Sequence, residues 1–150
     1  MRFILIMSFC LLTPLMINGQ DEKDNVETIF TTAEVMPRFP GCEDESRTND
    51  EKEACAKNKM LAYINDNLSY PDKAKIFKIR GVVVTQFVVN ENGGIENARV
   101  IRAIGYGCDE EALRLVKSMN DMEEPWVPGR QRGEVIKLLY TLPVRFNPDF

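Results

Sequence analysis

The segment from residue 81 to residue 104 constrains the fold of this chain more than any other. Residues 81–90 are rich in β-branched side chains and are apolar on both faces, which predicts a central β-strand. Residues 90–94 read Asn-Glu-Asn-Gly-Gly, and Asn and Gly tolerate the positive φ angles that a hairpin turn needs. Residues 95–104 are expected to form the return strand. The centre of the fold is therefore predicted to be an antiparallel hairpin.

Helical patterns lie on both sides of this hairpin. Apolar residues recur at helical spacing between residues 51 and 67, and Asp50 with Glu53 resembles a capping box at the start of that helix. Tyr70-Pro71 ends it, and a short basic turn is expected over residues 72–77. Asp109 is expected to cap a second helix, whose buried stripe comprises Ala112, Leu115, Val116 and Met119.

Residues 135–146 predict the last strand of the sheet. Every second side chain from Ile136 to Phe146 is apolar, which is typical of a strand with one buried face. Pro143 has no N–H to donate, so this strand belongs at an edge of the sheet or ends its pairing at that residue. The order of elements predicts an α+β fold: a three-stranded antiparallel sheet with two helices packed on one face.

The first twenty residues have the pattern of a secretory signal peptide. Arg2 precedes an apolar run over residues 3–17, and fifteen residues are too few to span a bilayer as a helix. We predict that residues 1–20 are cleaved near Gly19 or Gln20, which implies export. The alternative is an uncleaved signal that anchors the chain in the membrane.

Export changes the expected state of the cysteines, because disulfides persist in oxidising compartments. Cys42, Cys55 and Cys108 remain after cleavage. A bridge between Cys42 and Cys55 would close a short loop and stabilise the fold by about 3 kcal/mol. Pairings that use Cys108, or three free thiols, are the alternatives.

Charge divides the mature chain into two parts. Residues 21–53 contain eleven acids and four bases, whereas residues 54–150 contain twelve acids and fourteen bases. The first part is interpreted as an acidic N-terminal arm and the second as a compact domain. The overall charge of −4 argues against a nucleic-acid partner, since nucleic-acid binders need a basic surface.

The chain offers little catalytic chemistry. It contains no histidine, which removes histidine-dependent catalysis and histidine-ligated metal sites. It has no Gly-rich phosphate loop and no Cys-x-x-Cys pair, and its acidic clusters are interpreted as solvated segments. We therefore predict no catalytic residue, no metal and no cofactor, and a protein that is not an enzyme.

Two surfaces could bind a partner. Lys73, Lys75, Lys78 and Arg80, with aromatic residues between them, could face an anionic polymer or could simply be solvated. The edge of the last strand keeps its N–H groups from Val135 to Thr141, so a partner peptide could add a strand there. This second hypothesis requires that residues 135–141 are not covered by their own chain.

The chain resembles the C-terminal domain family of TonB energy transducers. The resemblance covers about residues 30–147, and a Met-Pro-Arg-Phe-Pro-Gly segment at residues 36–41 is similar to the lead-in of Bacteroidetes-type members. The motifs that carry it, in order, are Tyr70-Pro71, Ala74, Gly81-x-Val83, Phe87-Val88-Val89, Gly94, Ala112 and Trp126-x-Pro128-Gly129.

The resemblance implies a periplasmic domain that grips a short segment of an outer-membrane transporter by strand addition. It also implies a possible homodimer through edge strands. Carried onto this chain, the partner-binding residues are Asn67, Leu68, Ser69, Tyr70, Val135, Lys137, Leu139 and Thr141.

The chain departs from this family at its N-terminus. A transducer keeps its membrane anchor, often followed by a Pro-rich spacer, whereas only Pro37 and Pro40 lie between the predicted leader and the first helix. We therefore expect a free periplasmic protein-binding module. A membrane-anchored energy transducer and a module that binds peptidoglycan or another envelope polymer are the alternatives.

Overall fold

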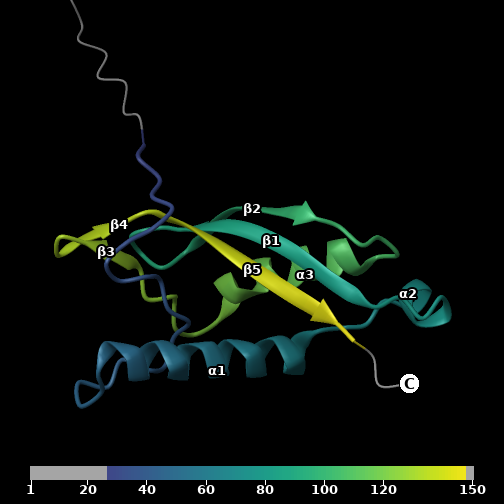
Figure 1. Ribbon diagram of the computed structural model, residues 1–150, viewed down its shortest axis with the longest axis horizontal. Helices are drawn as coiled ribbons and strands as arrows, with labels where there is room; N and C mark the ends of the chain where they lie inside the picture. Colours follow the sequence, from purple (N-terminus) through teal and green to yellow (C-terminus); the bar gives the residue numbers. More distant parts are fainter. Residues whose placement is uncertain (1–26, 148–150) are drawn as a thin grey trace, which may run out of the picture.

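The computed structural model describes residues 27–147, so the predicted signal peptide, residues 1–20, lies outside the described residues. The elements follow in the order α1 (Asn49–Asn67), α2 (Asp72–Ile76), β1 (Gly81–Val89), β2 (Ile95–Arg102), α3 (Cys108–Ser118), the 3-10 helix η1 (Met119–Asp121), β3 (Gly129–Gln131), β4 (Glu134–Ile136) and β5 (Leu138–Phe146) (Figure 1).

The main sheet has three antiparallel strands in the order β2-β1-β5. The β-branched strand β1 is central, as predicted, and it pairs with β5 over its whole length, from Gly81 opposite Phe146 to Val89 opposite Leu138. Strands β3 and β4 form a separate two-stranded hairpin. One long side of β5 is therefore an edge of the main sheet.

Both long helices pack on the same face of this sheet, which confirms the predicted α+β fold (Figure 1). The core between them is formed by alternate residues of β1 and β5 with apolar residues of α1 and α3, chiefly Val83, Phe87, Val144, Phe146, Met60, Ile64, Leu115 and Val116. Trp126 is 1% exposed at the centre of this core, and its ring lies 5.1 to 5.7 Å from those of Phe39, Phe87 and Tyr140.

Helix α1 begins two residues earlier than the sequence pattern indicated. Its cap is Thr48, whose hydroxyl accepts a hydrogen bond from the Glu51 N–H while the Glu51 carboxylate accepts one from the Thr48 N–H. The expected capping box of Asp50 and Glu53 is therefore wrong, because a Thr three residues before a Glu fits the same geometry better. The expected boundary between arm and domain, at residues 53 and 54, falls inside α1.

Helix α3 does not use Asp109 as its cap. The cap residue is Gly107, with a φ of 89°, and it makes no side-chain capping bond. The Asp109 carboxylate instead accepts hydrogen bonds from the N–H groups of Ile104 and Gly105, each at 2.8 Å. The acid that was expected to start the helix holds the loop between β2 and α3.

The last predicted strand, residues 135–146, is divided at Lys137. A tight hairpin joins β3 to β4 through Arg132 and Gly133, which both have positive φ angles as a two-residue turn requires. Val135 therefore pairs with Arg130 in this hairpin, and only residues from Leu138 onward pair with β1. The predicted alternation holds within β5, where residues 138, 142, 144 and 146 are buried.

Candidate peptide-binding edge

The outer edge of β5 consists of the backbone groups that point away from β1. The Leu139 N–H points outward, because it donates to an acceptor that is not on β1. Backbone groups alternate in direction along a strand, so the groups of residues 141, 143 and 145 also point outward. Odd-numbered residues of β5 therefore define its outer edge, and Pro143 contributes a carbonyl only.

The first half of this edge is covered by the chain's own N-terminal arm. The Leu139 N–H donates to the Phe30 carbonyl at 2.8 Å, and the Phe30 N–H donates to the Lys137 carbonyl at 2.9 Å. These two bonds form a parallel bridge between Phe30 and β5. The expectation of a free edge over residues 135–141 is therefore wrong at Lys137 and Leu139, where the distant Phe30 pairs. It is also wrong at Val135, which pairs with Arg130 in the β3–β4 hairpin and does not belong to the edge of the main sheet.

Side chains reinforce this covered half. The Lys137 ammonium forms an ion pair with Glu27 of the arm and a second one, at 3.7 Å, with Glu96 of β2. The hydrogen bond with Glu27 raises the pKa of Lys137. Lys137 therefore ties the arm to the sheet rather than offering a free charge to a partner.

The second half of the edge is open. Among residues 27–147, no hydrogen bond reaches the outward backbone groups of Thr141 or Arg145, and both side chains are exposed. This half presents two N–H donors together with the carbonyls of residues 139, 141, 143 and 145. It is long enough to pair with a short extended peptide.

A groove of about 640 Å³ runs beside the first residues of the open half. It lies between β5 and α1, and residues 36–39 of the arm also line it. Its walls are largely apolar, with Met36 and Pro37 from the arm, Met60 and Leu61 from α1, and Thr141 and Pro143 from β5. A strand added at Thr141 would place every second side chain over this groove.

The arm that frames the groove is held at four places along its length. After Phe30, Val35 exchanges two backbone hydrogen bonds with Arg130, and Arg38 exchanges two with Val127, at distances of 2.9 to 3.1 Å. A disulfide then joins Cys42 of the arm to Cys55 of α1, while Cys108 is free and buried. The acidic arm is thus a packed part of the structure.

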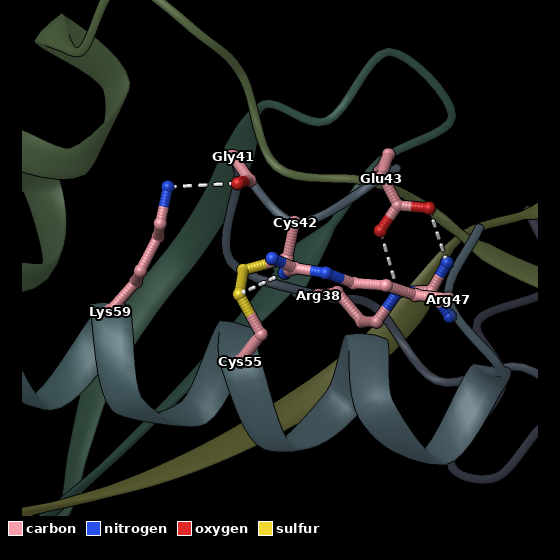
Figure 2. The surroundings of a disulfide bond; sticks show 7 residues. All are labelled: Arg38, Gly41, Cys42, Glu43, Arg47, Cys55 and Lys59. Atoms are coloured by element: carbon pink, nitrogen blue, oxygen red, sulfur yellow. Dashed lines mark hydrogen bonds and ion pairs between the residues drawn. A yellow bond between two sulfur atoms is a disulfide. The ribbon is translucent and has the colours of Figure 1, made fainter. Parts of the chain in front are cut away.

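The surroundings of the disulfide are basic (Figure 2). Arg47 Nη1 lies 2.9 Å from Cys55 Sγ, and Lys59 Nζ donates to the Gly41 carbonyl at 2.8 Å. Arg38 makes a bidentate pair with Glu43, at 2.6 and 2.8 Å, and this hydrogen bonding lowers the pKa of Glu43. Arg38 is only 7% exposed, and the structure gives its buried Nη1 no hydrogen-bond partner within residues 27–147. These contacts anchor the arm next to the groove.

Four predicted partner-binding residues, from Asn67 at the end of α1 to Tyr70, lie at the far end of β5. The ring of Tyr70 packs 5.8 Å from that of Phe146, and its hydroxyl donates to the Ile79 carbonyl. The Ser69 N–H donates to Glu111 at 2.6 Å, and the Asn67 carbonyl accepts from Arg114. Of the eight predicted partner-binding residues, only Thr141 lines the groove. Tyr70 packs against Phe146, at the opposite end of β5 from Leu138, so the structure does not gather the predicted residues into one site.

Glu111 forms hydrogen bonds that hold the chain after α1 in place at this end of β5. Burial works against its charged form, but hydrogen bonds from Arg114 and from the Ser69 N–H outweigh burial, so its pKa is lowered. Its Oε1 accepts from the Ser69 N–H, while both of its oxygens accept from Arg114, so Glu111 connects α3 to the chain that follows α1. Sequence reasoning missed this role, because Glu111 gave only the signal of an acid in the first turn of a helix.

The side-chain clusters and the helices of the described part of the chain bear on metal binding and on membrane crossing. Within residues 27–147, no group of three or more Cys, Asp or Glu side chains is placed to hold a metal ion. None of the helices in this part is long and apolar enough to cross a membrane.

The structure is a small α+β domain in which half of the outer edge of β5 is unpaired within residues 27–147. The chain belongs to the family described as the Gram-negative bacterial TonB protein C-terminal, which matches residues 66–148. The resembling lead-in at residues 36–41 lies outside that match. Membership implies a place in the bacterial envelope and a role in transport there.

Two solution structures of the TonB C-terminal domain of Helicobacter pylori are similar to this chain. One is 20% identical, with a TM-score of 0.45, and the match covers 61% of this chain and 91% of that one. The other is 19% identical, with a TM-score of 0.44, and covers 70% and 89%. No curated protein matches the chain.

Proposed function

We propose that this protein is a periplasmic binding module that captures an extended peptide of an envelope partner, such as a segment of an outer-membrane transporter. The peptide would join the sheet as a new strand along the outer edge of β5. The observation that carries this proposal is the pair of outward N–H groups at Thr141 and Arg145, which are unbonded within residues 27–147 and lie on an exposed edge.

The arm supports this proposal in two ways. Phe30 already pairs with Lys137 and Leu139, so this edge has the geometry to accept an extended backbone. The arm makes no backbone hydrogen bond with Thr141 within residues 27–147, so the backbone groups there stay available to a second segment. An incoming strand would begin at Thr141 and would extend over Lys137 only if Phe30 left.

The groove beside Thr141 gives the proposed site a basis for sequence specificity. Its apolar walls favour a peptide with apolar residues at alternate positions, while Asp50, Glu53 and Lys57 of α1 lie around it. Main-chain hydrogen bonds would provide affinity, and side chains in the groove would provide specificity.

Replacing Thr141 with proline tests the site. The Thr141 N–H points away from β1, so Thr141→Pro removes a donor from the edge without removing a bond of the sheet. A photoreactive residue at position 143 in intact cells should capture an outer-membrane transporter, and Thr141→Pro should abolish this capture. The matched control Thr141→Val keeps the N–H and should keep the capture.

Unchanged capture by a folded Thr141→Pro chain would reject the edge as the binding site. The cellular location is tested separately. Mass spectrometry of the native protein identifies its N-terminal residue. A chain that starts near Gln20 agrees with a free periplasmic module, whereas a retained leader agrees with a membrane-anchored transducer.

A further inference from the structure

The end of the molecule that carries α2 presents an apolar surface, which we call the α2 tip and define as Ile76, Phe77 and Tyr106. Ile76 is 74% exposed and Phe77 is 62% exposed, more than any other large apolar residue within residues 27–147. The Phe77 ring lies 5.4 Å from the ring of Tyr106, which is 47% exposed in the loop between β2 and α3. Figure 1 shows α2 projecting beyond the end of the sheet. Adjacent apolar side chains at a protruding end indicate a contact surface.

The local structure forces the α2 tip outward. Ala74 is fully buried, and its carbonyl accepts a hydrogen bond from the Ile79 N–H at 2.9 Å. Lys78 has a φ of 50°, the left-handed conformation that ends a helix and that glycine usually supplies. Ala74 and Ile79 anchor the turn on either side, and Ile76 and Phe77 lie on the exposed part between them.

Basic residues flank Ile76 and Phe77 of the α2 tip in the sequence. Lys73, Lys75, Lys78 and Arg80 fall within eight residues of a chain whose net charge is −4. Lys75 lies 3.5 Å from Asp72, an ion pair on the exposed surface, and Lys73 and Lys78 are exposed. Positive charge is therefore concentrated around exposed apolar side chains.

We propose that the α2 tip docks on an anionic lipid surface. Ile76 and Phe77 would enter the headgroup region, Tyr106 would lie at its boundary, and the lysines would contact lipid phosphates. Burial of apolar side chains and attraction of lysines to anionic headgroups both strengthen binding to a membrane surface. The proposal goes beyond peptide capture and does not depend on it, because it uses α2 and the loop before α3 rather than the edge of β5.

A lipid surface fits the α2 tip better than a polysaccharide does. Aromatic rings can stack on sugars, but Ile76, the most exposed residue of the tip, has no ring and no hydrogen-bonding group. A tip of three side chains is also small beside the roughly 800 Å² per partner of a standard protein interface. Anionic phospholipid is therefore the occupant that uses both the apolar and the basic residues.

Fluorescence of Phe77→Trp in the full chain tests the proposal. The new indole should shift to the blue and should be quenched by brominated lipids in phosphatidylglycerol vesicles, with little change in phosphatidylcholine vesicles. Trp126 is buried and provides a constant background. The matched control is Leu61→Trp, which places an indole at a site of α1 that is 46% exposed in the parent and should show no quenching. This readout reports the tip itself and not the apolar residues near the N-terminus.

Further substitutions in the Phe77→Trp chain separate the contribution of the lysines from that of the apolar side chains. Lys73→Gln with Lys78→Gln should weaken the partition into anionic vesicles by about 25-fold, since each lysine near the surface contributes about fivefold. Lys57→Gln with Lys117→Gln changes the charge equally on α1 and α3 and should have little effect. Ile76→Ser should weaken the partition by about fivefold.

Three results would overturn the proposal. They are an indole at position 77 that stays unquenched in anionic vesicles, equal loss from both lysine pairs, and binding to purified peptidoglycan without binding to vesicles. Circular dichroism of each variant checks that the fold is intact, which separates a loss of docking from unfolding.

Discussion

The two halves of the outer edge of β5 share one strand and one register with β1, yet they differ in what lies beside them. At Lys137 and Leu139 the chain's own Phe30 completes the hydrogen bonding, and Glu27 adds an ion pair to Lys137. At Thr141 and Arg145 the outward groups have no partner within residues 27–147. The difference comes from the arm and not from β5.

This comparison teaches that edge protection can be partial. Exposed strand edges invite pairing with other chains, and proteins cover or blunt them. Here the arm covers the first half, Pro143 removes one donor from the second, and a short stretch around Thr141 stays available. On the opposite border of the sheet, the Asn120 amide bonds both backbone groups of Ile95, which blocks the start of β2 in a similar way. Pairing of two copies through edge strands stays a prediction.

Removing the disulfide should have the largest effect on the covered half. Cys42→Ser with Cys55→Ser releases the arm next to α1, and closing a loop of this size contributes about 3 kcal/mol to the free energy of unfolding. Urea unfolding should show this loss, and hydrogen exchange at the Leu139 amide should accelerate while exchange at Thr141 stays the same. Adding reductant to the double variant is the control, since it should cause no further change.

Replacing Phe30 with proline should have the second largest effect on stability. The change removes the N–H that donates to Lys137, so we expect a loss of about 1 kcal/mol in unfolding free energy and faster exchange at Leu139. Phe30→Ala keeps both backbone bonds and should protect Leu139 better than Phe30→Pro does. Equal exchange rates at Leu139 in the two variants would contradict the bridge.

Glu43→Gln should have a similar or smaller effect and should depend on pH. Its carboxylate pairs with the buried Arg38 but is 36% exposed, so we expect a loss of about 1 kcal/mol at neutral pH. The hydrogen bond from Arg38 lowers the pKa of Glu43 below its ordinary 4.5, so the stabilisation is complete above that pH and is lost as the pH falls through the lowered pKa. Urea unfolding of both proteins as a function of pH measures this. A difference that grew on acidification would refute this account.

Glu27→Gln should have the smallest effect. Glu27 is largely exposed and its pair with Lys137 is screened by salt, so the expected change is about 0.5 kcal/mol or less. Urea titrations at low and high salt check it, because the difference between the proteins should shrink at high salt.

The hairpin and the helices could be predicted from the sequence because their signals are local. The β-branched run at residues 81–89, the Asn-Gly turn and the helical spacing in α1 each lie within one segment, and each element formed as expected. The errors arose where two local patterns compete. Thr48 replaced Asp50 as the cap, and the turn at Arg132 and Gly133 divided a strand whose alternation of side chains continued across it.

The covering of the edge was not readable from the sequence. Phe30 and Leu139 are more than one hundred residues apart, and a single backbone bridge leaves no periodic pattern in either segment. The groove depends in the same way on three separate elements, since Met36, Leu61 and Pro143 meet only in the folded chain. Pro143 did place β5 correctly at an edge, because its missing donor is a local fact with a direct structural meaning.

Hydrogen exchange at the backbone amides of Leu139 and Thr141, measured by nuclear magnetic resonance on the free protein, tests the central claim most directly. The half-covered edge predicts slow exchange at Leu139 and fast exchange at Thr141, although the two residues lie on the same side of the same strand. Slow exchange at both amides would show that the open half is covered as well, and would leave no edge for a partner to join.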